Sequence, residues 1–390
     1  MNVMSPATAD ETLTRSYVMN MYELTTLENL NNAFYECARA SSWKESTQHY
    51  QTNLLINNLK LQEELRTGSY TVSPPHKFAL NERGKLRNIE APAVRDRIIQ
   101  KLMCQKILIP QLTKPLIYDN YASLKDRGTA FARKRIDILL RKYIKQHGRN
   151  GYVLQVDIKK YFESVDHATL KEMVHKRIKE PKEVMDLIDY MIDSSSSSDK
   201  GLNLGSEAPQ IFAIYYLSRL DNYIKSVKGV KYYGRYMDDM FVFATSKEEL
   251  QMLLKDIKEQ LAEVKLEINE KKTHITKLSH GFTFMQIKYS ISNNRIIKRP
   301  THNKIVRERR RLKKFKALYE KGLVSELYVQ NCYKSWRNGV LKDCNAAHGT
   351  IHSLDMLYNS LFQNLEVFQR LSRNEIIDGA LMELEVATWM

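Results

Sequence analysis

The sequence predicts an α+β protein with an antiparallel sheet, and two observations lead to this class. Short apolar, β-prone runs alternate along the chain with longer segments of helical periodicity. Two such runs, 230–236 and 240–244, flank a turn of three residues, so they are expected to pair as a β-hairpin. A hairpin joins antiparallel strands, so this pattern favours an α+β arrangement over a doubly wound parallel sheet.

The composition is that of a globular protein, and its basic charge suits a polyanionic partner, with a soluble protein that is simply basic as the alternative. Apolar residues make up 43% of the chain, and 61 basic against 45 acidic side chains give a net charge of +16, which suits nucleic acid. No run approaches the roughly 20 uncharged apolar residues of a membrane span, and no apolar leader is visible. We therefore expect a cytoplasmic protein without a membrane partner, whose scattered cysteines (Cys37, Cys104, Cys332 and Cys344) are free thiols.

Helical periodicity dominates the first 150 residues. It predicts helical structure at 20–67 and helices at 94–112 and 129–146, with Pro110 and Pro115 at the exit of the second. The last of these helices carries Arg and Lys on its polar side.

The rest of the chain mixes strands with helices. The expected elements are a strand at 152–157, helices at 168–192, 210–226 and 247–265, a polar loop at Ser194–Ser198, and two short strands within 282–299 around Asn293. The basic composition of residues 304–342 predicts a helical element that faces phosphates. Residues 363–390 are expected to form an acidic tail.

Three carboxylates form the predicted catalytic site. Asp238 and Asp239 are adjacent at the hairpin tip, where they repel each other unless a cation offsets them, and their apolar flanks disfavour a solvated acidic turn. Asp157 ends a buried strand. Mg²⁺ takes oxygen ligands, commonly one or two carboxylates with substrate phosphates. We therefore expect Asp157, Asp238 and Asp239 to hold two Mg²⁺ ions, with Mn²⁺ as a substitute, for metal-assisted nucleotidyl transfer.

Two of these segments resemble the catalytic motifs of bacterial reverse transcriptases. They are Tyr236-Met237-Asp238-Asp239 and Asp157-Ile-Lys-Lys-Tyr-Phe162, and the resemblance covers roughly residues 45–360. It implies an RNA-directed DNA polymerase with the right-hand fold, which acts on an RNA template, a DNA or RNA primer and dNTPs. A cognate structured RNA and an accessory protein are further expected partners. The implied organisation is an N-terminal helical extension (1–44), fingers (45–150), palm (151–296), helical thumb (297–362) and a tail of unknown role (363–390).

The same resemblance implies a set of nucleotide-binding residues. Arg87, assisted by Lys85, corresponds to a triphosphate ligand in the fingers motifs at 85–89 and 94–100, a role that suits a guanidinium fork. Ile158 and Phe162 follow the first catalytic Asp, and Phe162 would exclude a 2′ hydroxyl; a purely structural core Phe is the alternative.

Further implied contacts lie downstream of Phe162. They come from Leu204, Gly205 and Gln210 in the loop that holds nucleotide and template base, from Tyr121–Thr129 nearby, and from Lys272 near the departing pyrophosphate.

The loop at 204–210 departs from many relatives. Leu204 stands where they have Gln, and Gln210 closes the motif, a pattern that resembles the diversity-generating branch. An aliphatic side chain cannot make the hydrogen bond of an amide, so we expect reduced fidelity.

Primer and template contacts are implied at three places. These are Tyr236 and Met237 in the catalytic hairpin, Gly281 and Phe282 in a primer-grip hairpin, and Arg310 and Lys314 on the thumb helix. Gln286 stands where relatives often have Gly, which leaves the grip geometry open.

Several alternatives remain from the sequence. Cys332, Cys344, His348 and His352 offer zinc-type ligands, but their spacing is unlike that of structural zinc sites. The polymerase could serve phage defence rather than a diversity-generating or similar retroelement. A catalytically dead RNA-binding polymerase fold and an RNA polymerase are further alternatives, which the three acidic residues and Phe162 disfavour.

Overall fold

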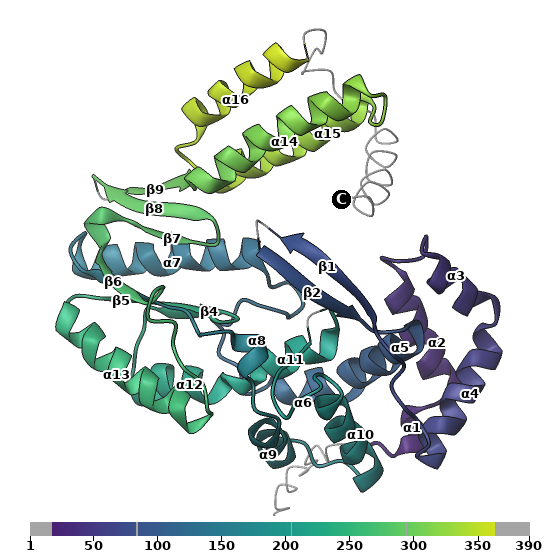
Figure 1. Cartoon of the computed structure of the whole chain (residues 1–390). Helices are drawn as coiled ribbons and strands as arrows, with labels where there is room; N and C mark the ends of the chain where they lie inside the picture. Colours follow the sequence, from purple (N-terminus) through teal and green to yellow (C-terminus); the bar gives the residue numbers. More distant parts are fainter. Residues whose placement is uncertain (1–17, 83–84, 204, 294, 363–390) are drawn as a thin grey trace, which may run out of the picture. The chain divides into compact units, whose positions relative to one another are not determined.

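The computed structural model describes residues 18–82, 85–203, 205–293 and 295–362 and divides them into two compact units. Unit 1 contains residues up to 123 together with 158–229 and 257–269, and unit 2 contains 124–157, 230–256 and 270 onward. Helices accompany sheets whose described strand pairs are all antiparallel, so the predicted α+β class is confirmed (Figure 1). No helix within these residues has the length and apolar character to cross a membrane.

Unit 1 begins with four helices where the sequence predicted a helical region at 20–67. They are α1 (Met21–Leu24), α2 (Leu27–Ala38), α3 (Glu45–Thr52) and α4 (Leu54–Thr67). Asn20 starts α1 with a capping box, the Thr26 side chain caps α2, and Gly68 ends α4 in the left-handed conformation. These local signals explain why the region is divided rather than continuous.

A two-stranded hairpin follows that the sequence did not predict as strands. It pairs β1 (His76–Glu82) with β2 (Lys85–Ala91) in register His76↔Ala91. Its alternation is weak because charged and apolar side chains share both faces, so period-2 patterning gave no signal. Lys85 and Arg87 belong to β2; their side chains lie outside the described structure.

The helix predicted at 94–112 is helical throughout but changes type. It runs as α5 (Val94–Met103), a π-helical turn η1 (Cys104–Leu108) and α6 (Ile109–Leu112), with Pro110 inside the last segment. Proline lacks an N–H and crowds the carbonyl four residues earlier. The wider π-turn directly before α6 is a recognised way to accommodate such a local disruption.

The prediction of one helix at 168–192 is wrong. The chain forms α9 (His167–Arg177) and α10 (Lys182–Asp193), and Pro181 is the residue that precedes α10. Proline disfavours helical conformation in the residue before it, which explains the break. The other elements here are α8 (Tyr161–Ser164), α11 (Glu207–Tyr216), α12 (Ser218–Asn222) and the π-turn η2 (Tyr223–Val227), so the helix predicted at 210–226 is also divided.

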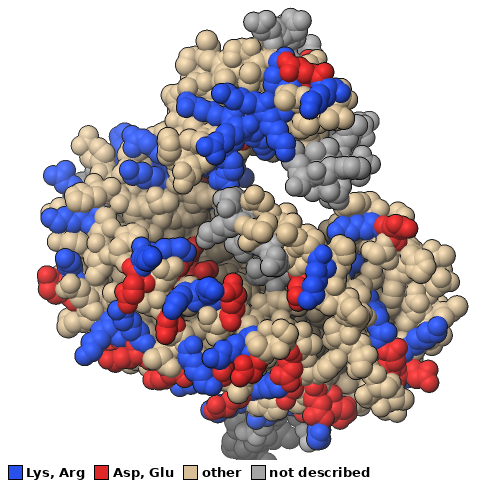
Figure 2. Space-filling view, viewed as in Figure 1, with Lys and Arg blue, Asp and Glu red and all other residues tan. Residues whose placement is uncertain are grey.

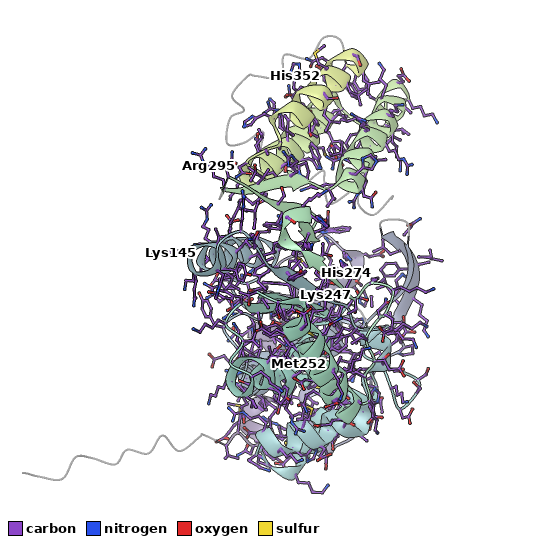
Figure 3. All side chains as sticks on the ribbon, turned by 90° about the vertical axis from the view of Figure 1, so that its left-hand side faces the viewer. Lys145, Lys247, Met252, His274, Arg295 and His352 are labelled. Atoms are coloured by element: carbon purple, nitrogen blue, oxygen red, sulfur yellow. The ribbon has the colours of Figure 1, made fainter. Side chains whose placement is uncertain are left out.

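Unit 2 is built on a four-stranded sheet in the order β4-β5-β3-β6. The strands are β3 (Tyr152–Val156), β4 (Tyr233–Tyr236), β5 (Asp239–Ala244) and β6 (His274–Lys277). The helices α7 (Thr129–His147) and α13 (Lys247–Glu263) agree with the predictions at 129–146 and 247–265, although α13 ends in unit 1. Figure 3 shows Lys247 where α13 begins and His274 where β6 begins.

A second sheet in unit 2 contains one strand more than the two predicted. It consists of β7 (Phe282–Phe284), β8 (Ile287–Ser292) and β9 (Arg295–Pro300), preceded by the 3₁₀ turn η3 (Leu278–His280). The Phe282 ring stacks on Tyr289 at 5.1 Å between centroids, and it also meets Phe243 of β5. Aromatic contacts therefore join this sheet to the first one.

The basic segment at 304–342 forms helices with a core of their own. The helices are α14 (His302–Glu320), α15 (Glu326–Asp343) and α16 (His348–Leu361). Buried Leu312, Tyr333 and Tyr358 belong to one apolar cluster, and the two Tyr rings stack at 4.7 Å. All four cysteines are free thiols, as predicted.

Candidate active site

The hairpin at the predicted catalytic site forms as expected, but its turn is one residue shorter than the three residues that the sequence predicted. Tyr236 pairs with Asp239 across β4 and β5, which leaves only Met237 and Asp238 in the turn. Met237 has φ +54°, in the left-handed region that two-residue hairpin turns require and that non-glycine residues adopt at some cost. The tight turn places two carboxylates at consecutive positions beside the end of β3.

Strand register brings Asp157 to the same place. Val156, the last residue of β3, pairs with Met240 of β5, so Asp157 follows beside Asp239. Burial and the carboxylates of Asp238 and Asp157 raise the pKa of Asp239 from 3.8 to about 7. Burial, with Asp157 nearby, also raises the pKa of Asp238. The three acidic groups therefore share one electrostatic environment within unit 2.

Lys272 contacts this acidic group directly. Its Nζ donates a hydrogen bond to Asp157 Oδ2 at 2.6 Å, and that bond raises the pKa of Lys272. The backbone N–H of Asp157 points to Thr273 Oγ1 at 3.4 Å. Lys272 and Thr273 thus lie against Asp157, the first of the predicted catalytic carboxylates.

The donor set suits Mg²⁺ by its chemistry. In the described part of the chain no three His, Cys, Asp or Glu side chains are close enough to hold one ion, and this includes the proposed zinc ligands. Asp157, Asp238 and Asp239 nevertheless offer only oxygen atoms. Burial, and after it the neighbouring carboxylates, raise the pKa of Asp238 and of Asp239, and a bound cation would favour the ionised form of both. Since Mg²⁺ takes few protein ligands and completes its shell with water and substrate, these residues fit it.

The predicted nucleotide-binding segments of unit 1 also lie close together. Gly205 has φ +120°, and a Cβ at this position would lie 3.5 Å from Ile89 Cγ2 on β2, the strand that carries Lys85 and Arg87. Leu204, in the same loop, lies outside the described residues. The loop is therefore held against the strand that was predicted to bind the triphosphate.

Other members of this predicted set differ in exposure. Phe162 is half-buried, whereas Ile158 is 1% exposed and forms an isolated bridge with Ile268. Gln210 is exposed on α11, and its Oε1 accepts a hydrogen bond of 2.9 Å from Ser123 Oγ. Ser123, with φ +53°, belongs to the segment 121–129 that was predicted to lie near nucleotide and template.

Comparisons with known proteins assign the family. The family model for reverse transcriptase (RNA-dependent DNA polymerase) matches residues 75–292. The chain belongs to the reverse transcriptase family. A curated relative, Protein YkfC of Escherichia coli (strain K12), is 23% identical over 276 residues, which are 60% of this chain and 71% of YkfC.

Solved structures of telomerase also resemble this reverse transcriptase family member. The apo Candida tropicalis enzyme, truncated from its C-terminal domain, aligns with a TM-score of 0.44 and 13% identity over 63% of this chain and 60% of its own. The Candida albicans enzyme, in complex with a TWJ fragment of telomeric RNA, aligns with a TM-score of 0.45 and 10% identity over 81% and 59%. The chain spans about three fifths of the telomerase chains it matches.

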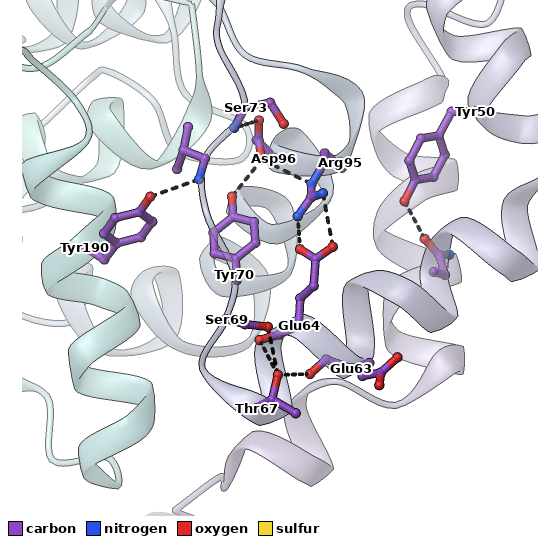
Figure 4. A network of polar contacts seen from close by, with 12 residues as sticks. Tyr50, Glu63, Glu64, Thr67, Ser69, Tyr70, Ser73, Arg95, Asp96 and Tyr190 are labelled. Carbon is purple, nitrogen blue, oxygen red and sulfur yellow. Dashed lines mark hydrogen bonds and ion pairs between the residues drawn. The ribbon is translucent and has the colours of Figure 1, made fainter.

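The segment 94–100 contains polar residues that join α5 to the preceding part of unit 1. Asp96 is 1% exposed and accepts hydrogen bonds from Tyr70 Oη at 2.8 Å and the Ser73 N–H at 3.0 Å (Figure 4). Arg95 forms an ion pair with Glu64 of α4. These contacts assign Arg95 and Asp96 a structural role, which sequence motifs alone did not distinguish from ligand binding.

Residues predicted to contact primer and template fall into two groups. Tyr236 and Met237 are half-exposed at the hairpin, and Arg310 and Lys314 are exposed on α14, where Lys and Arg side chains gather (Figure 2). Phe282 is only 5% exposed, so its ring belongs to the core of unit 2.

Gly281 has a steric reason to be glycine. It has φ +73°, and a Cβ there would collide with the Tyr289 carbonyl oxygen. Met285 and Gln286, at φ +46° and +61°, form the following turn, so Gln286 occupies a conformation that glycine adopts more easily.

Proposed function

We propose that this chain is an RNA-directed DNA polymerase that makes cDNA by two-metal nucleotidyl transfer. The supporting observation is the group of three carboxylates, Asp157, Asp238 and Asp239, at the adjoining ends of β3, β4 and β5. Membership of the reverse transcriptase family supports the same reaction class. The expected substrates are an RNA template, a primer and dNTPs.

The acidic group, Lys272 and Phe162 have separate roles in this proposal. Asp157, Asp238 and Asp239 would hold two Mg²⁺ ions, which supply Lewis-acid activation of the primer 3′ hydroxyl and charge stabilisation of the leaving pyrophosphate. Lys272, now paired with Asp157, carries a positive charge that suits a developing phosphate charge. Phe162 would exclude the 2′ hydroxyl of a ribonucleotide.

Primer extension on an RNA template tests the reaction. With Mg²⁺, the purified chain is expected to extend a DNA primer with dNTPs and to use NTPs poorly. Extension with NTPs alone would instead favour an RNA polymerase. RNA binding without any extension would favour a catalytically dead polymerase fold.

Replacing Phe162 by Ala is expected to admit ribonucleotides. The half-buried ring lies five residues after Asp157, and its removal leaves space for a 2′ hydroxyl. We expect the ratio of kcat/KM for dNTP over NTP to fall about tenfold or more, the size of a single well-packed steric contact. Met252→Ala is the control, because this apolar side chain on α13 is 66% exposed (Figure 3). An unchanged ratio in Phe162→Ala would assign the ring to the core.

The biological role proposed is synthesis of cDNA for a diversity-generating or similar retroelement, with a cognate structured RNA and an accessory protein as partners. It is supported by the pattern of Leu204, Gly205 and Gln210. A role in phage defence is the alternative, and the neighbouring genes distinguish the two.

Replacing Leu204 by Gln is expected to raise fidelity. The amide restores a hydrogen bond to the nucleotide that Leu cannot make, a contact that contributes about 1 kcal/mol or roughly fivefold in discrimination. Sequencing of cDNA made on a defined RNA would measure misincorporation opposite adenine. Equal error rates in both proteins would contradict the proposed reason for low fidelity.

A further inference from the structure

Two segments of unit 1 that are about 35 positions apart in sequence are joined by a series of backbone hydrogen bonds. The Leu202 N–H donates to the Phe162 carbonyl at 2.6 Å, and the Gly201 N–H donates to the Val165 carbonyl at 2.8 Å. The His167 N–H donates in turn to the Asp199 carbonyl at 3.0 Å. We call residues 199–202 the strap. It ends one residue before the loop 203–206, which contains Leu204 and Gly205.

His167 adds a side-chain hydrogen bond to this backbone pairing. Its ring is 3% exposed, and Nε2 lies 2.7 Å from the Gly201 carbonyl oxygen. Because a carbonyl can only accept, Nε2 carries the proton and donates. On its other side, Nδ1 is 3.6 Å from Asp193 Oδ1, an exposed carboxylate that also pairs with Lys171. The imidazole therefore fixes the strap at the residue where its backbone turns with φ +102°.

The far end of the loop is fixed to the same region. Tyr161 Oη donates to the Ala213 carbonyl of α11, the helix that begins at Glu207 directly after the loop. Tyr215 Oη of α11 donates to the Met173 carbonyl of α9 at 2.9 Å. The described residues on both sides of Leu204 are therefore attached to the chain between Tyr161 and Met173, which includes Phe162.

We propose that His167 is a positioning residue, which sets the place of Gly205 relative to Phe162 and so couples base selection to sugar selection. This inference rests on the proposed function, because it uses the predicted roles of Phe162 and the loop. Without the Nε2–H donor, the buried Gly201 carbonyl loses its side-chain partner, and the strap gains freedom at its centre. Phe162 and Gly205 would then no longer keep a fixed position relative to each other, so sugar selection and base selection would weaken together.

The test compares three variants by kinetics. His167→Phe keeps a planar ring but removes the donor, His167→Gln keeps an amide N–H near the position of Nε2, and His175→Phe is the matched control. His175 also lies on α9 and also contacts a carboxylate, Asp189, but it is largely exposed and does not touch the strap. We expect His167→Phe to raise ribonucleotide incorporation and misincorporation together, each about fivefold, through KM for the nucleotide more than through kcat. His167→Gln should restore both to within about twofold, and His175→Phe should resemble the wild type.

Hydrogen exchange tests the attachment without any catalytic activity. In His167→Phe, the amides of Gly201 and Leu202 should exchange about tenfold faster than in the wild type, while those of β3 and β5 keep their protection. If His167→Phe does not fold, His167→Asn, a smaller side chain that does not reach the Gly201 carbonyl, replaces it in both measurements.

Two results would overturn the proposal. One is a folded variant in which the strap amides remain protected. The other is a variant with freed strap amides in which sugar and base selection are unchanged or change independently. A wild-type chain that made no DNA would contradict the proposed function, and exchange would still decide whether His167 holds the strap.

Discussion

Asp239→Asn is expected to abolish DNA synthesis while it stabilises the metal-free protein. Asp239 carries a raised pKa of about 7 because it is buried next to Asp238 and Asp157. Its ionised form therefore costs folding free energy, and the neutral amide removes this cost without changing the shape of the side chain. The same amide cannot replace a carboxylate as a magnesium ligand, so synthesis should fall by at least about a thousandfold.

The stabilisation should depend on pH in a defined direction. The folded pKa lies above the ordinary value of 3.8, so folding takes up a proton between these two values. Near pH 4 the carboxyl is neutral in the folded protein and about half ionised in the unfolded chain, so the substitution should stabilise the protein only slightly. Above pH 7 the folded protein carries the buried charge in full. Asp239→Asn should then raise the free energy of unfolding by on the order of 2 kcal/mol, after an allowance for solvent screening.

Unfolding by urea in EDTA, at pH 4 and pH 8, measures this gain. Asp186→Asn is the control, since Asp186 is exposed and forms a favourable pair with Lys182, so its loss should not stabilise the protein. Added Mg²⁺ should stabilise the wild type more than Asp239→Asn. Equal stability of the two proteins at pH 8, or DNA synthesis by the variant, would contradict the role of Asp239.

The hairpin and its carboxylates were predictable because their signal is local. Two β-prone runs around a three-residue turn leave few alternatives, and Asp157 ends a third such run. The register that brings Asp157 beside Asp239 is a contact between distant parts of the chain, and it was inferred from the family motifs rather than from periodicity.

What the sequence missed depends on tertiary contacts. The hairpin β1–β2 has only weak apolar alternation, and the interruption at Pro181 was hidden by apolar residues with helical spacing on both sides. The role of His167 had no sequence signal at all, since its partner is the backbone carbonyl of Gly201. A sequence motif records the identities of side chains, so it cannot record a hydrogen bond to a backbone carbonyl.

Gly281→Ala is expected to be among the most destabilising single substitutions in unit 2. The residue has φ +73°, which costs a residue with a Cβ about 1–2 kcal/mol. The added Cβ would also meet the Tyr289 carbonyl oxygen, an atom of the β8 backbone. β8 pairs with both β7 and β9, so it cannot shift without disturbing the three-stranded sheet. We expect a loss of about 3 kcal/mol or more in the free energy of unfolding.

Gly339→Ala provides the matched control. Gly339 lies in α15 and shows no positive φ, and an added Cβ would meet no atom of the described residues within 4 Å beyond its own helix backbone. Alanine there should therefore stabilise the helix by up to about 1 kcal/mol. Urea unfolding should therefore show a lower free energy of unfolding for Gly281→Ala and a higher one for Gly339→Ala.

Because Gly281 precedes the strand that was predicted to grip the primer, its variant should also require more primer for half-maximal extension. A Gly281→Ala protein as stable as the wild type would show that β8 can move away from the turn, and the predicted grip would then lack a rigid support.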